Sequence, residues 1–352
     1  MPLCAAHKAR LAAVMAPRRH PGAQGTLALT WLVGDIGATN ARFGLVSPDG
    51  ALLHSSTYAA ADFAEIGAAI AAYLATRGDL PMPRRGALAI AAPITGDQIA
   101  MTNHPWSFSV AGLRDRLGFE RLIAINDFTA VALAVPRLSA EDRMAVGSGA
   151  PLERQPIAVI GPGSGLGVSG LVPAGSGWVA LAGEGGHVTM APGNDRESAV
   201  LEVMRRGFGH VSAERCLSGP GLVNLYNSLA SLDGAPAAPY TAAQIIDPDT
   251  GARDPLCREA TAMFCAMLGT VAGDLALTLG ARGGVYIAGG IVGRLGPRFA
   301  DSPFRERFEA KGRMSALVAA IPSYVVTHQL PAFLGCAAAL AADSQAGQNA
   351  RH

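Results

Sequence analysis

The chain of 352 residues is long enough for two lobes or one large domain, and half of it is hydrophobic while only 16% is charged. That composition excludes a disordered protein, and a net charge of +1 with a pI near 7.7 excludes a strong field of one sign that would attract nucleic acid or an acidic membrane. We therefore expect a small-molecule substrate, no nucleic-acid partner and no membrane.

The flanking and apolar segments suggest a cytoplasmic protein. Residues 1–26 lack Asp and Glu and are predicted to be a disordered or non-native extension, because Leu11–Ala16 is too short for a signal-peptide core. Five scattered cysteines show neither zinc nor disulfide spacing, which is typical of free thiols in a reducing compartment. The apolar run Ala262–Leu279 contains Asp274 and two glycines, so we expect a buried core helix instead of a membrane span.

The first half alternates strand-like and helical stretches, which predicts an α/β fold. Two expected strands, Leu29–Val33 and Ala41–Val46, flank a glycine turn over 34–40. The following stretches are an expected helix Asp62–Arg77, strand Gly86–Ala92, strand Arg121–Ile125 and helix Phe128–Val135. Pro136 and the polar residues up to Gly149 are interpreted as the passage into a second lobe.

The second half opens with the same order of strand, glycine turn and strand. Ile157–Ile160 and Val168–Val172 flank a turn over 161–167, which suggests two related α/β lobes with a cleft between their glycine hairpins. The later expected elements are helices over 196–206, 221–230 and 256–280, strand Val285–Ala288, a helix opening at Gly289-Gly290, strand Ser323–Val326 and helix Phe333–Ala342.

The first glycine turn runs Gly34-Asp35-Ile36-Gly37-Ala38-Thr39-Asn40. Small residues in a tight turn let backbone N–H groups approach a phosphate, and Asp35 is suited to hold hydrated Mg²⁺. An ordinary β-hairpin turn is the alternative, because Gly and Asp are favoured there in any case.

The second glycine turn contains Gly163-Ser164-Gly165, and residues 165–170 formally match GxGxxG. A strand follows instead of the helix that a dinucleotide fingerprint requires. No P-loop motif occurs, and the chain has only two lysines, Lys8 and Lys311. Backbone amides and a metal must therefore neutralise any bound phosphate.

Polar residues at the ends of other segments offer further chemistry. Asp127 follows a buried strand, where a carboxylate can accept a hydroxyl proton, but Asn126 and Asp127 are equally typical of a helix N-cap. Glu184 and His187 lie in a glycine-rich loop that can present both to sugar hydroxyls, or that is a plain exposed loop. Gly289-Gly290 can bring a helix N-terminus close to a nucleotide, or serve only close packing.

Taken together, these segments resemble the bacterial glucokinase family of the actin-like sugar-kinase superfamily, over about residues 30–340. The matching segments are Val33-Gly-Asp-Ile-Gly-Ala-Thr-Asn-Ala-Arg42, Ala92-Pro-Ile-Thr-Gly-Asp97, Met101-Thr-Asn-His-Pro-Trp-Ser-Phe108, Ile125-Asn-Asp-Phe-Thr-Ala130, Gly183-Glu-Gly-Gly-His-Val188, Gly209-His-Val-Ser-Ala-Glu-Arg215, Leu217-Ser-Gly-Pro-Gly-Leu-Val-Asn-Leu-Tyr226 and Ile287-Ala-Gly-Gly-Ile-Val292.

The resemblance implies a two-lobed actin-like (ribonuclease H-like) ATPase and sugar-kinase fold with an interlobe cleft. The small lobe would comprise 27–137 plus 328–345, and the large lobe 138–327. The implied enzyme is a cytoplasmic, homodimeric glucokinase that transfers the γ-phosphoryl group of ATP to the 6-hydroxyl of glucose at the first step of glycolysis.

The resemblance also implies a role for each matching residue. Asp127 would be the catalytic base, and Asn126, Asp127, Glu184, His187 and Glu214 would bind glucose. Glu214 rests on the resemblance alone, since an exposed helix carboxylate is its ordinary interpretation. ATP would contact Gly34, Asp35, Ile36, Gly37, Ala38, Thr39, Gly163, Ser164, Gly165, Gly289 and Gly290, with Asp35 near Mg²⁺ and holding it through water.

The chain departs from the family at Ala38, where a second glycine is common. A positive φ there would strain the turn by about 1–3 kcal/mol, whereas a negative φ would tolerate the methyl group. Two alternatives to glucokinase stay open: a kinase for another hexose or amino sugar, and a catalytically silent sugar sensor. The presence of both Asp35 and Asp127 argues against the sensor.

Overall fold

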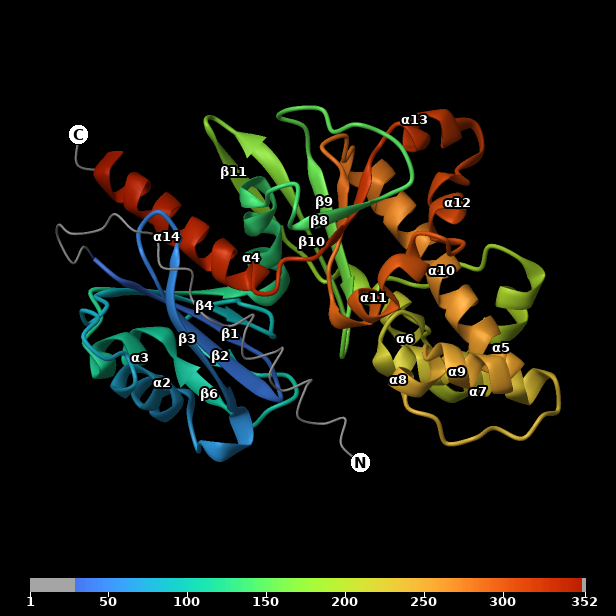
Figure 1. Cartoon of the computed structure of the whole chain (residues 1–352), viewed down its shortest axis with the longest axis horizontal. Helices are drawn as coiled ribbons and strands as arrows, with labels where there is room; N and C mark the ends of the chain where they lie inside the picture. Colours follow the sequence, from blue (N-terminus) through green and yellow to red (C-terminus); the bar gives the residue numbers. More distant parts are fainter. Residues whose placement is uncertain (1–28, 350–352) are drawn as a thin grey trace, which may run out of the picture.

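A computed structural model describes residues 29–349 and shows two mixed sheets with helices packed around them (Figure 1). The expected extension over 1–26 and the thiol of Cys4 lie outside the described residues. The other cysteines, Cys216, Cys257, Cys265 and Cys336, are buried free thiols, as predicted.

The first sheet is built from residues before Asp127 and has the order β3-β2-β1-β4-β7. Its strands are β1 (Trp31–Ile36), β2 (Asn40–Val46), β3 (Leu52–Ala59), β4 (Arg85–Ile90) and β7 (Arg121–Asn126). A small hairpin, β5 (Gln98–Ala100) with β6 (Ser107–Ser109), and helices α2 (Ile66–Ala75) and α3 (Val110–Leu117) accompany it. The C-terminal α14 (Pro331–Asn349) returns to this sheet, where Phe333, Cys336 and Leu340 join the core with Val33 and Ala89.

The second sheet has the order β11-β10-β9-β12-β13-β8. Its strands are β8 (Arg143–Val146), β9 (Ile157–Pro162), β10 (Leu166–Ala174), β11 (Gly177–Ala182), β12 (Val285–Ile287) and β13 (Ser323–Val326). Its helices are α5 (Asp195–Phe208), α6 (Ala213–Cys216), α7 (Gly219–Leu232), α8 (Ala242–Ile245), α9 (Pro248–Arg253), α10 (Pro255–Leu279), α11 (Gly290–Leu295), α12 (Phe304–Glu309) and α13 (Ser315–Ala319).

Helix α10 has the length and hydropathy of a membrane span, but more than half of its apolar window is buried inside the protein. Phe264, Met267 and Leu268 are among its residues in the core of the second sheet. The expectation of a core helix over this run is therefore confirmed.

Helix α4 (Asp127–Ala134) packs on both sheets and follows directly from β7. Ala130 belongs to the core of the first sheet, whereas Val131 and Ala132 belong to a cluster with Ile157 and Leu171 of the second. Figure 1 shows α4 and α14 between the two sheets. The first residue of α4, Asp127, is thus placed where the two halves of the chain meet.

Several observed elements were not predicted, among them strands β3, β5, β6, β8 and β11 and helix α3, and both glycine turns differ in length from the expectation. Strand β3 was not predicted, because its sequence Leu-Leu-His-Ser-Ser-Thr-Tyr-Ala is polar and lies at a sheet edge, where neither face needs a regular apolar pattern. The turns over 34–40 and 161–167 are shorter than expected, because β1 and β2 pair up to Ile36 and Ala41, and β9 and β10 up to Pro162 and Leu166.

Candidate functional site

The sequence left open whether Asn126 and Asp127 cap a helix or act on a substrate, and the structure gives the capping role to Asn126. Asn126 is the N-cap of α4, and its Oδ1 accepts from the N–H groups of Phe128 (2.9 Å) and Thr129 (3.1 Å). Its amide reaches the carbonyl of Ala92 at 3.4 Å. Because Asn126 does the capping, the carboxylate of Asp127 is left for other chemistry.

Asp127 is a half-buried carboxylate with an unusual pKa. Burial raises the pKa of Asp127 to about 6, although an N–H donor from Phe128 opposes the rise. The negative charges of Asp35 and Glu184 raise this pKa further. The fold therefore brings three predicted site residues, from three distant segments, within electrostatic range of one another.

The first hairpin presents fewer backbone donors than the sequence suggested. Gly34, Asp35 and Ile36 lie in β1, and Gly34 lacks a side chain because a Cβ would be 2.7 Å from the side chain of Leu88. The turn proper is Gly37-Ala38-Thr39, with Gly37 N–H bonded to the carbonyl of Asn40 at 2.9 Å.

Ala38 carries no strain, since Arg154 is the only non-glycine residue with positive φ among those described. Within residues 29–349 the amides of Ala38 and Thr39 donate no hydrogen bond, so they are the N–H groups that the turn can offer to a phosphate.

Asp35 lies directly opposite Arg42 in the hairpin, and its Oδ2 is 2.9 Å from Arg42 Nη1. No cluster of three or more His, Cys, Asp or Glu side chains suited to a metal occurs between residues 29 and 349. A lone carboxylate fits Mg²⁺ that is held mainly by phosphate oxygens and water, which is how nucleotide sites use this ion. It does not fit a metal centre built by the protein alone.

Glu214 points inward from α6 and not to the surface, which corrects the ordinary interpretation of this residue. Its Oε2 accepts the N–H of Leu166 at 2.8 Å, and it also lies beside Gly165. In the same turn the carbonyl of Gly163 accepts the N–H of Gly219 at 2.8 Å, whereas Ser164 is exposed. One Glu214 oxygen is thus used to hold the second glycine turn.

The loop that carries Glu184 and His187 packs its backbone closely on β10, while these two side chains are exposed. Its glycines lie on β10: a Cβ at Gly185 would be 2.7 Å from Val168, and one at Gly186 would overlap the carbonyl of Leu166. Glu184 and His187 are exposed and make no side-chain hydrogen bond among residues 29–349. Because Leu166 contacts both this loop and Glu214, three of the predicted sugar ligands surround one strand end.

Gly289 is a glycine by necessity. Its φ is +97°, and a Cβ would overlap the carbonyl of Pro162 at the end of β9. Gly290 begins α11, is exposed and has open space around it. The two predicted nucleotide segments of the second half, 163–165 and 289–290, therefore lie side by side.

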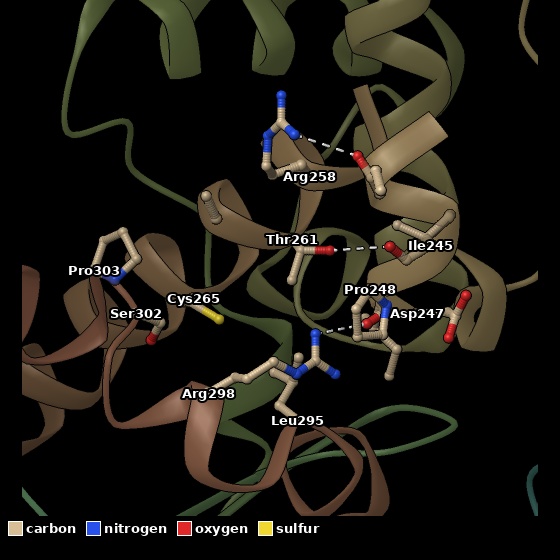
Figure 2. A pocket seen from close by; sticks show the side chains of 14 residues that line it. Ile245, Asp247, Pro248, Arg258, Thr261, Cys265, Leu295, Arg298, Ser302 and Pro303 are labelled. Carbon is tan, nitrogen blue, oxygen red and sulfur yellow. Dashed lines mark hydrogen bonds between the residues drawn. The ribbon is translucent and has the colours of Figure 1, made fainter. Parts of the chain in front are cut away.

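A cavity of about 380 Å³ opens beside α8, α9, α10 and the end of α11, and none of the predicted site residues lines it (Figure 2). Its polar side chains serve backbone carbonyls: Arg298 donates to Ile246 at 3.1 Å, and Thr261 donates to Ile245 at 3.2 Å. These bonds tie α8 to its neighbours.

Three residues near Asp127 were missed as site residues. Arg42 becomes visible only with the hairpin register that sets it opposite Asp35. Phe128 packs its ring on the second glycine hairpin. Thr129 carries the only buried side-chain oxygen without a hydrogen-bond partner in the described part of the chain, and although it lies in the matching segment 125–130, the sequence assigned it no role.

Comparisons with known proteins agree on one family. Residues 32–343 match the family described as Glucokinase. A glucokinase from Paramagnetospirillum magneticum is 52% identical over 307 residues, covering 87% of this chain and 96% of the relative, and one from Aromatoleum aromaticum is 51% identical over 310 residues, covering 88% and 94%.

Solved structures give the same result. A glucokinase from an Antarctic psychrotroph superposes with a TM-score of 0.81 at 38% identity, covering 88% of this chain and 98% of that chain. A ROK family glucokinase from Streptomyces griseus in complex with glucose and AMPPNP shares the fold, with a TM-score of 0.60 at 19% identity and coverage of 89% and 99%. From its sequence and its fold, this chain belongs to the glucokinase family.

Proposed function

We propose that this protein is an ATP-dependent glucose 6-phosphotransferase with Asp127 as its general base. The observation that carries the proposal is the position of Asp127, at the start of the helix between the two sheets and near Asp35 and Glu184. Membership of the glucokinase family supports the substrates, as do family structures described as complexes with glucose and with glucose and AMPPNP.

Asp127 accepts the proton of the 6-hydroxyl as that oxygen attacks the γ-phosphorus of ATP. A bond forms between O6 and phosphorus, the bond from phosphorus to the β–γ bridging oxygen breaks, and ADP leaves. A base with a pKa of about 6 is ionised at neutral pH and still basic enough to assist the transfer.

The sugar is held by the groups around Leu166 and by the cap of α4. Glu184 and His187 offer an acceptor and a second polar contact, and Glu214 offers the oxygen that Leu166 does not use. Asn126 contributes its amide N–H₂, because its carbonyl oxygen is committed to the helix. The mixture of donors and acceptors suits neighbouring hydroxyls.

The nucleotide lies along both glycine turns. The amides of Ala38 and Thr39, the turn 163–165 and the start of α11 at Gly289-Gly290 take its phosphates and flank the rest of it. Asp35, together with the phosphates, would hold Mg²⁺ through water, and this ion would supply the charge neutralisation that no lysine near these turns provides among residues 29–349.

Two lobes, 27–137 plus 328–345 and 138–327, form the cleft in this proposal, and α4 and α14 belong to the first lobe, with α4 packed on the second. Closure of the cleft excludes water, a competing nucleophile that would otherwise hydrolyse ATP. The proposed enzyme is a cytoplasmic homodimer, and light scattering after gel filtration measures the assembly.

Coupled ADP release with a panel of hexoses tests the proposal. We expect turnover with glucose and Mg·ATP, and a loss of at least about 10²-fold in kcat for Asp127→Asn. Preference for another hexose or an amino sugar would replace glucose as the substrate. Glucose binding without ADP release would identify a silent sensor, and near-native turnover of the variant would remove Asp127 as the base.

A further inference from the structure

Phe128 joins the proposed base to the second glycine hairpin. Its N–H donates to the Oδ1 atoms of Asp127 and Asn126, each at 2.9 Å, so its backbone fixes both side chains. The half-buried ring packs on the cluster that holds Val159 and Leu171 of the second sheet. A single residue therefore contacts the carboxylate on one side and the opposite sheet on the other.

The ring lies on two glycines that face each other across β9 and β10. Gly161 and Gly167 are register partners. A Cβ at Gly161 would be 2.5 Å from Cζ of Phe128, and at Gly167 the three nearest atoms to an added Cβ are all ring atoms of Phe128, in overlap. Because glycine has no side chain, this pair leaves the space that the Phe128 ring occupies.

This contact is at the base of the proposed nucleotide turn. Gly161 is followed by Pro162 and the turn 163–165, and an added Cβ at Gly161 would also be 2.9 Å from the carbonyl of Ala288, just before Gly289. Displacement of the ring would change the distance between the Asp127 carboxylate and the backbone that holds the phosphates.

We propose that Phe128 is a positioning residue that sets the separation between the Asp127 carboxylate and the nucleotide turn 163–165, through the seat of its ring on Gly161 and Gly167. The inference rests on the proposed kinase function and deepens it. It predicts a specific defect in kcat, because in-line transfer is sensitive to displacements of about 1 Å, which can reduce a rate by about 10²-fold.

The first test compares Phe128→Ala and Phe128→Leu with Phe63→Ala, a half-buried phenylalanine in the first half of the chain. We expect kcat to fall by about 10- to 100-fold in Phe128→Ala, with partial recovery in Phe128→Leu and less than about a threefold change in the KM for glucose. Phe63→Ala should lower the melting temperature and leave kcat within about twofold.

A double-mutant cycle with Gly167→Ala supplies a readout that a general loss of packing would not give. The methyl group should reduce kcat in the wild type by displacing the ring, and have little further effect in Phe128→Ala, where no ring is present. Additive effects in the cycle would overturn the inference, and so would a Phe128→Ala enzyme with kcat within about threefold of wild type.

Glucose-dependent ADP release by the wild type distinguishes a failure of this inference from a failure of the proposed function. An active wild type with an unaffected Phe128→Ala variant overturns the positioning role alone. A wild type without glucose-dependent ADP release overturns the kinase proposal and the inference with it.

Discussion

Asp127 meets two opposing requirements at the scale of single residues. Catalysis needs its carboxylate charged in a site that can exclude water, whereas burial and the charges of Asp35 and Glu184 favour the protonated form. The sequence places both Asn126 and Asp127 at this strand end. From the sequence alone, either residue could cap the helix, and the resemblance gives both a role in binding glucose. The capping bonds of Asn126 separate the two roles, and they depend on where the helix begins.

The pH dependence of kcat/KM for glucose should report this pKa. Asp127 must be ionised to accept a proton, and burial raises its pKa to about 6. We expect activity to be constant near neutral pH and to fall about tenfold for each unit below pH 6. A profile that stays flat down to pH 5 would contradict a base with this environment.

The same environment predicts that Asp127→Asn stabilises the fold. A raised pKa means that the folded state penalises the charged carboxylate, so the penalty is complete above pH 6 and disappears as the pH falls towards 4. Removal of the charge should raise the free energy of unfolding by about 1–3 kcal/mol at pH 8 and have little effect near pH 4. Urea denaturation at the two pH values measures the difference, and a loss of stability at pH 8 would contradict it.

At the scale of elements, the local sequence pattern of the two glycine hairpins predicts that the hairpins exist, whereas the strand register decides which residues pair in them. Strand, glycine turn and strand were predicted in both halves, and both hairpins exist. The pairing of Asp35 with Arg42, and of Gly161 with Gly167, follows from register, which a turn with several glycines close together leaves open.

Gly289 tests whether the junction of β12 and α11 is built for a nucleotide. Gly289→Ala places a methyl group at a φ of +97° and against the carbonyl of Pro162, so strain of about 1–3 kcal/mol is expected. If the nucleotide depends on this backbone, the KM for ATP should rise by about tenfold while the KM for glucose changes little.

Gly293→Ala is the matched control in the same helix, because its added Cβ has open space and no unusual φ is required. Steady-state kinetics with ATP and with glucose varied separately distinguish the two substitutions. Equal effects of both, or a change in glucose KM alone, would count against a nucleotide role for this junction.

At the scale of the whole molecule, the two sheets are joined through α4 and α14. Gly335 of α14 crosses α4 so closely that a Cβ would overlap the carbonyl of Ala130. The same helix places the Cys336 thiol 3.6 Å from the carbonyl of Gly34 in β1. The C-terminal helix therefore supports both the strand that carries Asp35 and the helix that begins with Asp127.

Gly335→Ala should separate these helices and destabilise the protein by about 1–3 kcal/mol or more, because backbone cannot move aside as a flexible side chain can. Gly207→Ala is the matched control in the exposed part of α5, where the added Cβ has open space. That substitution should stabilise the protein by about 0.5–1 kcal/mol through helix propensity. Thermal denaturation of both variants measures the contrast, and a Gly335→Ala protein as stable as wild type would show that the helices can separate without cost.

The sequence by itself determined the α/β class, the two glycine hairpins, the core helix α10 and the set of carboxylates and glycines that marks the glucokinase family. These features depend on periodicity and on short motifs, which neighbouring residues encode. The tertiary structure decided which residues meet: Asp127 with Asp35 and Glu184, Glu214 with Leu166, and Phe128 with Gly161 and Gly167. Such contacts join segments far apart in the chain, and only the packing of the two sheets around α4 fixes them.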